Sequence, residues 1–363
     1  MVASMMDETT IVENRSEIVF LYDVVDANPN GNPLSEENRP RIDPQTRKAI
    51  VTDVRLKRYL RDQLEADGHG VYIRNVNQDG EQYTRERLLE DRLKSIDLDE
   101  YDPDDDDDLV RLRRKVFDTF LNSSVDVRYF GATLSVDAGE YSKALPDHFT
   151  GPVQFSPAKS MNKIRENESY ESLSSVIATQ EGKKKGGFDL ADHRIQYGLF
   201  RFHGLVDEHA AEDTKLSKAD IERLDTLCWR ALKNQTITRS KKGHEPQLYL
   251  RIEYNTDSYH IGRLDRGFQI DRKAEQTKPD TEIQNIRGVT ISIDDFVNTI
   301  KQNSQRISTV HVMVNDSLIM SHQGKSGGKE VLYTALERAL DEEAVHEIDV
   351  YEEYADTLPN SNE

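Results

Sequence analysis

The sequence has a single cysteine, Cys228, among its 363 residues. One cysteine excludes an internal disulfide and any metal site built from a cysteine cluster. Long hydrophobic runs are missing too, and no stretch approaches the ~20 apolar residues of a membrane helix. The first residues show neither the basic nor the apolar segment of a secretory signal. We therefore expect the protein to work in the cytoplasm.

Basic residues are in the minority: 48 Lys and Arg stand against 67 Asp and Glu, which gives a net charge of -19. Taken alone, this charge disfavours binding to nucleic acid, which is itself a polyanion. The surplus of acid also indicates a halophilic source. In ~1 M salt the Debye length falls to about 3 Å, so repulsion acts only at short range and direct contacts decide binding.

The charge is distributed unevenly along the chain. Residues 90–108 contain eleven acids and two bases, and residues 342–363 contain eight acids and neither Lys nor Arg. Residues 39–61, in contrast, carry eight bases and two acids. A basic segment in so acidic a chain is a candidate contact for an anionic partner.

Motifs for common cofactors are absent from the sequence. QGKSGGK at 323–329 resembles a phosphate-binding loop, but Ile319 stands where that pattern needs Gly, so we expect a mobile loop before a helix. DPDDDDD at 102–108 lacks the central Gly and the terminal Glu of a calcium loop. The histidines show no HExxH spacing, and no nucleophile elbow occurs. We expect no cofactor, no metal and no catalytic activity.

Hydrophobic periodicity predicts an α+β fold. Strands are expected at 17–25, 71–76, 126–136, 195–207, 247–255 and 309–315. Helices are expected at 53–67, in the interrupted stretch 84–121, and at 217–234, 292–303 and 328–345. The two types alternate without a strict βαβ rhythm, which favours α+β over a doubly wound sheet.

One domain is expected over residues 16–345, between two tails. Residues 1–15 are predicted to be disordered, and the acidic residues 346–363 to be mobile. Two insertions are expected, at about residues 78–122 and at 137–195. The second has little apolar content and is predicted to lie outside the main sheet.

DANPNGNP at 26–33 ends the first predicted strand and leads through a proline-rich loop into a basic helix. Thr52 is the expected N-cap of this helix. One helix face carries Leu56, Tyr59, Leu60 and Leu64, and the other carries the bases Arg55, Lys57, Arg58 and Arg61. The basic face is either solvated or bound to phosphate. Lys57 and Arg61 are expected to lie opposite the apolar face, so reversing their charge should leave the fold intact.

Two further segments are basic. TRSKKGHEP at 238–246 is either a phosphate-contacting loop or a surface turn, and KKKGG at 183–187 is either a flexible basic loop or a solvated tip. Asp26 and Asp43 flank the proline-rich loop. With a metal they would activate an RNA 2′-hydroxyl, which would make the chain a metal-dependent endoribonuclease. The simpler interpretation is that they cap turns.

Five segments, in this order, resemble one known family: FLYDVVDANPNGNP, NRPRIDPQTRKAIVTDVRLKRYLRD, DVRYFGATLS, GPVQFSPAKSMNKI and TRSKKGHEPQLYLRIEY. They are similar to the CRISPR-associated backbone subunit of type I Cascade complexes, the seventh Cas family, and in particular to its haloarchaeal subtype I-B. The resemblance extends over residues 17–270. The acidic insert at 97–108 and the C-terminal tail lie outside it.

The resemblance implies a ferredoxin-like, RRM-related palm with finger and thumb insertions, the thumb coming from residues 137–195. It implies that copies of the chain stack along the spacer of one guide RNA (crRNA) and present it for pairing with target DNA. The implied partners are therefore crRNA, target DNA through the guide heteroduplex, further copies of the chain and other Cascade subunits. A separate helicase-nuclease cuts the target. Related type III subunits cut RNA with a loop Asp, and this chain resembles the non-cutting branch.

A holder of any spacer needs phosphate contacts from several loops rather than a pocket that reads one base, since pairing supplies the sequence specificity. The expected RNA contacts are therefore polar and basic residues of the segments above. They are Asn28, Asn30, Gly31, Arg39, Arg41, Arg55, Lys57, Arg58, Arg61, Lys159, Ser160, Lys183, Lys184, Lys185, Arg239, Ser240, Lys241 and Lys242.

Overall fold

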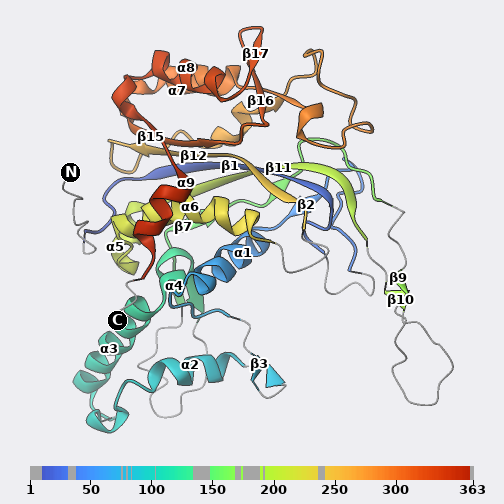
Figure 1. Ribbon diagram of the computed structural model, residues 1–363. Coiled ribbons are helices and arrows are strands. Elements are labelled where there is room, and N and C mark those ends of the chain that lie inside the picture. The colour runs from blue at the N-terminus through green and yellow to red at the C-terminus, as the bar shows by residue number, and fades with distance from the viewer. Residues whose placement is uncertain are drawn as a thin grey trace, which may run out of the picture.

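The structure is a computed structural model that describes residues 10–31, 38–74, 77–78, 81–82, 84–102, 104–133, 148–167, 173–174, 189–190, 193–235 and 242–359. Helices and strands are mixed along the chain around one six-stranded sheet, as Figure 1 shows. The expectation of a fold with both α and β elements is confirmed. Among the described helices, none combines the length and the apolar character that crossing a bilayer requires.

The central sheet has the strand order β18-β15-β12-β1-β11-β7. Its strands are β1 (Ser16–Ala27), β7 (Val153–Phe155), β11 (Ile195–Val206), β12 (His244–Tyr254), β15 (Ile307–Val314) and β18 (Val345–Glu347). Neighbours run antiparallel except β15 and β18, which are parallel. Four of the predicted strands are thereby confirmed as β1, β11, β12 and β15.

β1 lies inside the sheet because its residues are apolar on both sides. Phe20 and Tyr22 pack into the apolar cluster on one face, and Val19 and Leu21 pack into the cluster on the other. All four side chains are fully buried. A strand that is buried on both faces carries a nearly continuous apolar run rather than an alternating one.

Two helices cover one face of the sheet: α1 (Asp53–Ala66) and α6 (Lys218–Lys233), with α5 (Glu208–Thr214) beside them (Figure 1). The Thr52 side chain caps α1 by accepting a hydrogen bond from the backbone N–H of Arg55, as expected. The predicted apolar face of α1 is buried: Leu56, Tyr59, Leu60 and Leu64. Both helix predictions are confirmed.

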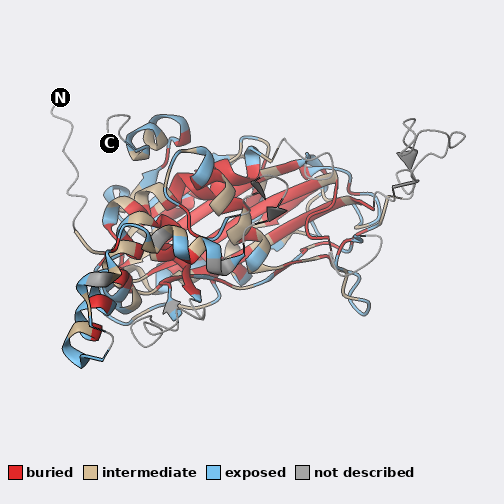
Figure 2. Cartoon of the chain, turned by 90° about the horizontal axis from the view of Figure 1, so that it is seen from below, coloured by how far each residue is buried: buried red, intermediate tan, exposed pale blue. Residues whose placement is uncertain are grey.

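A second layer covers the opposite face of the central sheet. It contains a four-stranded sheet of β13 (Gln269–Ile270), β14 (Thr290–Ser292), β16 (Ile319–His322) and β17 (Lys325–Gly327), with α7 (Asp294–Gln302) and α8 (Lys329–Ala339). The helices predicted at 292–303 and 328–345 are confirmed, although α8 ends at Ala339. Because both layers contribute apolar side chains, the central strands are buried on both sides, as Figure 2 shows in red.

An arm extends away from the sheet and is seen at the bottom of Figure 1. It contains α2 (Arg85–Leu93), η1 (Leu98–Glu100) and α3 (Asp106–Ser123), which leads into α4 (Val125–Phe130). Leu89, Leu112, Val116 and Phe120 belong to a separate apolar cluster within the arm. The acidic segment before α3 caps this helix, since the Asp105 side chain accepts from the N–H groups of the following turn.

The remaining elements are short. The paired strands are β2 (Ile50–Val51) with β8 (Ala158–Lys159), β3 (Asn77–Gln78) with β4 (Glu81–Gln82), β5 (Gly131–Thr133) with β6 (His148–Thr150), and β9 (Leu173–Ser174) with β10 (Asp189–Leu190). The short helices are η4 (Leu264–Gly267), η5 (Ile286–Gly288), η6 (Ser304–Arg306), η7 (Glu342–Ala344), α9 (Val350–Glu353) and η8 (Tyr354–Thr357).

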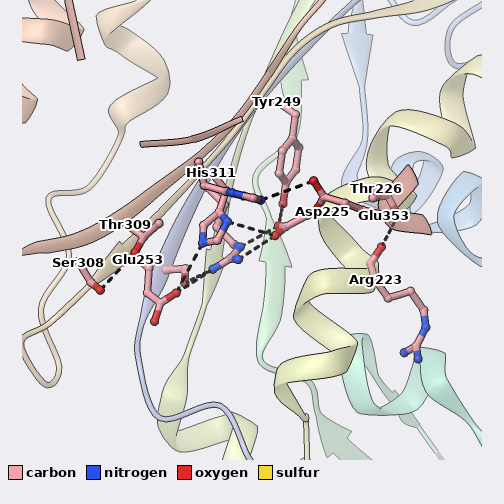
Figure 3. Close-up of polar contacts among 12 residues, drawn as sticks. Arg223, Asp225, Thr226, Tyr249, Glu253, Ser308, Thr309, His311 and Glu353 are labelled. Carbon is pink, nitrogen blue, oxygen red and sulfur yellow. Dashed lines mark hydrogen bonds and ion pairs between the residues drawn. The ribbon is translucent and has the colours of Figure 1, made fainter. Parts of the chain in front are cut away.

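A buried ion pair ties α6 to the sheet (Figure 3). Arg251 on β12 donates through Nε and Nη2 to the two carboxylate oxygens of Asp225 on α6, each at 2.7 Å. The Tyr249 hydroxyl donates to the same carboxylate at 2.7 Å. The His311 ring lies 4.0 Å from the Asp225 carboxylate and 3.8 Å from the Glu253 carboxylate. These hydrogen bonds satisfy charges that would otherwise destabilise the interior.

Two strand predictions are wrong. Residues 71–74 form no strand, and the N–H groups of Tyr72 and Ile73 donate to the buried Asp126 carboxylate instead of to a neighbouring strand. The segment predicted as a strand at 126–136 begins as helix α4, and among its described residues, 126–133, only Gly131–Thr133 is extended. Both segments have β-branched composition, but packing around Asp126 decides their conformation.

The polar segment 137–195 does not lie wholly outside the main sheet. β7 pairs with the end of β11, and Ile164 is buried in the same apolar cluster as α1. Residues 148–167 therefore belong to the body of the fold, which corrects the prediction for this part. QGKSGGK is also no simple loop, because it contains the turn and second strand of the β16–β17 hairpin.

Both tails are held more tightly than predicted. Arg15 forms ion pairs with Asp207 and Glu208 at 2.6 Å each, so residues 10–15 are attached to α5. At the other end β18 joins the sheet, and η8 packs on α6, where the Arg230 guanidinium lies 4.0 Å from the Tyr354 ring. The predictions of disorder and mobility are wrong for residues 10–15 and 346–359.

Candidate nucleic-acid interface

The loop after β1 is held by its own asparagines. Asn28 donates to the carbonyl of Asn38 at 2.8 Å, and the Asn30 side-chain oxygen accepts from the Thr52 N–H at 2.8 Å. Both side chains are almost fully buried. Gly31 is needed for packing, because a Cβ there would meet the Asn38 side chain. The asparagines thus shape the loop and point inward, and their contact with RNA stays a prediction.

The bases of α1 do not form one open face. Lys57 donates to Gln154 at 2.7 Å, and Arg61 donates to Asp126 at 2.9 Å. Both cations lie over the Phe130 ring, and their side chains are only 12% and 11% exposed. The expectation that these two bases lie opposite the apolar face is wrong, because α4 packs against that side of α1.

Of the other two bases of α1, Arg58 is more accessible than Lys57 and Arg61. Arg58 is half-exposed and pairs with Asp62 at 2.7 Å, one turn along the helix. Arg55 lies over the Tyr59 ring at 5.8 Å. Exposed pairs of this kind are weak and exchange readily for another anion. Of the predicted basic face, Arg58 is the residue that the structure leaves most accessible to a phosphate.

A basic groove of about 800 Å³ lies beside β2 and β8, on the side of the sheet covered by the second layer. Its bases come from segments far apart in the sequence. They are Lys48, Lys159, Arg201, Arg263, Arg266 and Arg272, which we call the groove bases. Among the described residues that line the groove, Asp265 is the only acid, and it is buried under Arg201 and Arg263 at 3.3 and 3.0 Å.

The groove concentrates positive charge in a chain that is otherwise acidic. The pKa of Lys48 lies below its usual value because the side chain is partly buried and because Arg201, Arg272 and Lys159 are close, although Asp280, which pairs with Arg272 at 2.6 Å, opposes the shift. Burial lowers the pKa of Arg201 as well, Asp265 opposes the shift, and the neighbouring Arg263 and Arg266 add to it. Cations that are held against one another in this way favour an anionic ligand with several charges.

Four further predicted contacts lie at or near the groove and the first loop. Lys159 is exposed at the groove and pairs with Asp43 at 2.7 Å. Ser160 is buried and bonds to the backbone of Ala49 and Asn162, so its role is to join two segments. Arg39 and Arg41 are exposed on the strand-like segment that returns toward β2, where Arg39 lies 3.7 Å from Glu166.

Lys242 is exposed beside a second, smaller cavity at the start of β12. The remaining predicted contacts, Lys183, Lys184, Lys185, Arg239, Ser240 and Lys241, lie outside the described residues. The structure brings Lys159 together with bases that the sequence did not single out, and it separates Lys57 and Arg61 from them.

Asp26 and Asp43 form hydrogen bonds that hold the segments on either side of the proline-rich loop. The Asp26 carboxylate accepts from Asn167 at 2.6 Å, and its carbonyl accepts from Arg194 at 3.0 Å. Asp43 accepts from the N–H groups of Gln45 and Thr46, and its hydrogen bond from Lys159 lowers its pKa to about 2. Across the described part of the chain, no three His, Cys, Asp or Glu side chains gather as metal ligands would.

Arg201, Arg263, Arg266 and Arg272 are groove bases that the sequence analysis missed. Arg201 carried a signal, because it stands between the apolar residues Phe200 and Phe202 of β11 and therefore faces the side opposite to theirs. The other three lie in a loop and a short helix, where no periodicity marks the direction of a side chain.

The chain is similar to a protein family, to a relative in sequence and to a solved structure. The family model of CRISPR-associated protein Cas7 matches residues 14–294. CRISPR-associated protein Cas7 from Haloferax volcanii is 45% identical over 350 residues, which cover 94% of this chain and 98% of that protein. A chain of a solved CRISPR RNA-guided surveillance complex, pre-nicking, superposes with a TM-score of 0.51 at 12% identity, over 94% of this chain and 99% of that chain. This last likeness concerns the fold alone.

Proposed function

The chain belongs to the CRISPR-associated protein Cas7 family, and from this premise we propose that it is a guide-RNA-binding backbone subunit of a multi-subunit Cascade complex. The groove bases are the observation that carries the proposal. They form a polycationic surface on a chain with a net charge of -19. A sequence-independent RNA holder needs this arrangement, because its ligand is a phosphate chain.

The proposal extends to a ferredoxin-like, RRM-related core. The order of elements β1, α1, β7, β11, α6, β12 and the spatial order β12-β1-β11-β7 support it. An RRM commonly binds RNA on the open face of its sheet. Here the second layer buries that face, including Val19 and Leu21. The RNA therefore binds along loops and the groove rather than across the strands.

The finer features follow from the resemblance and form part of the proposal. The subunit is of type I-B, works in the cytoplasm, stacks in several copies on the spacer and presents it to target DNA. It is not an enzyme. The position of Asp26 and Asp43 is consistent with this role, since both carboxylates hold the loop through hydrogen bonds.

Purification of the full chain from a halophilic host in high salt tests the function. We expect repeat-spacer RNAs to co-purify, with further copies of the chain and other Cascade subunits. Sequencing of the bound nucleic acid gives the readout. A preparation that carries no repeat-spacer RNA would overturn the proposal.

The same preparation tests the absence of catalysis. Bound RNA is incubated with Mg²⁺ or Mn²⁺ and its length is followed by gel electrophoresis. Intact RNA is the expected result. Cleavage that disappears in both Asp26→Ala and Asp43→Ala would instead establish a metal-dependent endoribonuclease.

A further inference from the structure

An acid is buried inside the basic groove. Asp265, in η4, is only 2% exposed, and its carboxylate contacts two of the groove bases. Arg263 donates through Nε and Nη2 to the two carboxylate oxygens, each at 3.0 Å. The Nε atom of Arg201 on β11 lies 3.3 Å from Oδ2 of the same carboxylate. One carboxylate therefore joins two arginines that come from segments far apart in the sequence.

The short helix that carries Asp265 is fixed by packing. Leu264 and Phe268 are buried in the apolar cluster on the side of the second layer. Gly267 lies so close to α7 that a Cβ there would meet the backbone of Phe296. A side chain on a firmly packed element can hold its partners within a narrow range of positions. Asp265 is therefore a fixed acceptor for the arginines around it.

Arg263 has a backbone conformation that residues other than glycine seldom adopt. Its φ of +57° lies in the left-handed region. The N–H of the preceding Gly262 donates to the buried carboxylate of Glu17 at 2.9 Å, which holds the turn. Such conformations persist where the surrounding contacts enforce them, and they are common at binding sites. In this turn the Arg263 side chain reaches the Asp265 carboxylate.

The pairing leaves part of each guanidinium available to a ligand. A guanidinium has five N–H donors. Nη1 of Arg201 donates to the Phe268 carbonyl, and its Nη2 has no partner among the residues that the structure describes. The same is true of Nη1 of Arg263 within that part of the chain. The two side chains are 22% and 47% exposed, so these nitrogens can donate to a phosphate while Asp265 holds the others.

Charge and geometry give opposite signs for the effect of Asp265 on a polyanionic ligand. By charge alone, an acid in the groove weakens binding. Without it, however, the two guanidinium groups would repel each other, and both long side chains would be free to turn toward solvent. Fixing them on binding costs conformational entropy, which a side chain already held in place avoids. In ~1 M salt the Debye length of about 3 Å reduces the effect of charge and leaves the geometry unchanged.

We propose that Asp265 is a positioning residue, which holds Arg201 and Arg263 in the geometry that binds phosphate and thereby strengthens the binding of a polyanion. The identity of that polyanion as RNA rests on the proposed function. The groove then contains one acid that supports binding, whereas acids that pair with its exposed bases compete with the ligand.

The test compares two acids that pair with groove arginines. Asp265→Asn and Asp280→Asn each remove one negative charge, and Asp280 pairs with the exposed Arg272 at 2.6 Å. Calorimetry on the full chain in ~1 M salt measures binding of a mixed-sequence RNA oligonucleotide and of inorganic polyphosphate. We expect Asp265→Asn to bind both probes about tenfold more weakly, and Asp280→Asn to bind them at least as tightly as the unmodified chain. Binding by folded Asp265→Asn that equals or exceeds that of the unmodified chain would overturn the proposal.

A second pair of variants covers the case in which Asp265→Asn does not fold. Arg263→Lys changes an exposed side chain and keeps its charge, but an ammonium cannot pair with both carboxylate oxygens as the guanidinium does. We expect it to bind both probes about fivefold more weakly. Arg272→Lys, at the same groove, is the matched control and is expected to stay within about twofold of the unmodified chain. A merely structural role would lower the melting temperature and leave the affinity of the folded chain unchanged, so equal affinity of the two lysine variants would contradict the proposal.

The two proposals fail in different ways. Repeat-spacer RNA that co-purifies, together with undiminished binding by Asp265→Asn, rejects the positioning role and leaves the guide-RNA function standing. A preparation without repeat-spacer RNA rejects the guide-RNA function, and weaker binding of polyphosphate by Asp265→Asn would still support the positioning role. An unmodified chain that binds neither probe rejects the positioning role.

Discussion

Arg61 on α1 donates through Nε to the Oδ2 atom of Asp126 on α4 at 2.9 Å. Asp126 is fully buried, and the same carboxylate accepts from the N–H groups of Tyr72 and Ile73. The pair joins α1 to the base of the arm, at the point where the chain enters and leaves it. Arg61 is therefore a structural residue on a helix whose remaining bases face solvent or a ring.

Arg61→Ala is expected to lower the free energy of unfolding by about 3–5 kcal/mol, because it leaves a buried carboxylate without its cation. Chemical denaturation in high salt measures this loss. Arg58→Ala is the matched control, since its half-exposed pair with Asp62 contributes about 1 kcal/mol or less. Equal stability of the two variants would show that the Asp126 pair does not hold the arm.

The double variant Lys159→Ala and Arg266→Ala is expected to weaken RNA binding and to lower the slope of log K against log salt by about one per lost phosphate contact. Both bases are exposed at the groove, so the fold should be unaffected. Titration of a single-stranded RNA at several salt concentrations gives the slope. Arg338→Ala, exposed on α8, is the control for loss of positive charge alone. A slope unchanged from wild type would remove the groove from the RNA path.

Asp23→Asn is expected to stabilise the fold above neutral pH by roughly 2–4 kcal/mol and to have little effect below about pH 4. The pKa of Asp23 is raised by burial to about 7 in the folded chain, from 3.8. The folded state therefore binds more protons between these values, and stability falls as pH rises through that window. Denaturation at a series of pH values checks the sign. Asp316→Asn, on an exposed turn, should show no such pH dependence.

Deletion of residues 349–363 is expected to destabilise the fold by a few kcal/mol. It removes Val350, which is buried in the cluster beneath α6, and the ring contact between Tyr354 and Arg230. Burial of one aliphatic side chain contributes about 1.5–3 kcal/mol and a cation–π contact about 1 kcal/mol. Thermal unfolding in high salt measures the change. A melting temperature unchanged from the full chain would mean that the C-terminal segment does not support α6.

The long central strands and the helices α1 and α6 could be predicted because each carries one strong pattern. β1 is apolar on both sides, and α6 has buried residues at helical spacing from Ile221 to Leu232. The segment 71–74 could not be predicted in the same way. Its β-branched residues suggest a strand, but Asp126 supplies acceptors that satisfy the backbone of Tyr72 and Ile73. Such a partner lies more than fifty residues away in sequence, and no local pattern contains it.

The candidate site could be predicted only in part, because most of its bases are brought together by the fold and not by a local sequence pattern. Lys159 was found through a family segment, and it does line the groove. Arg263, Arg266 and Arg272 reach the groove only because η4 and β13 return to the face of β11 that carries Arg201. The tails were missed because a few contacts hold each of them, such as Arg15 with Asp207, and polar composition hides such contacts.

Both faces of the central sheet are covered by packed layers, so a ligand reaches its strands only where a cavity opens beside them, as at Arg201 of β11 in the basic groove. Ligand binding then depends mainly on residues near the ends of the strands and in the loops that follow them. The stability of the fold depends on the apolar residues between the layers. The two properties occupy different residues. Substitutions that change the affinity for a nucleic acid can therefore accumulate without lowering the stability of the fold. High salt would screen the surface charges in any case.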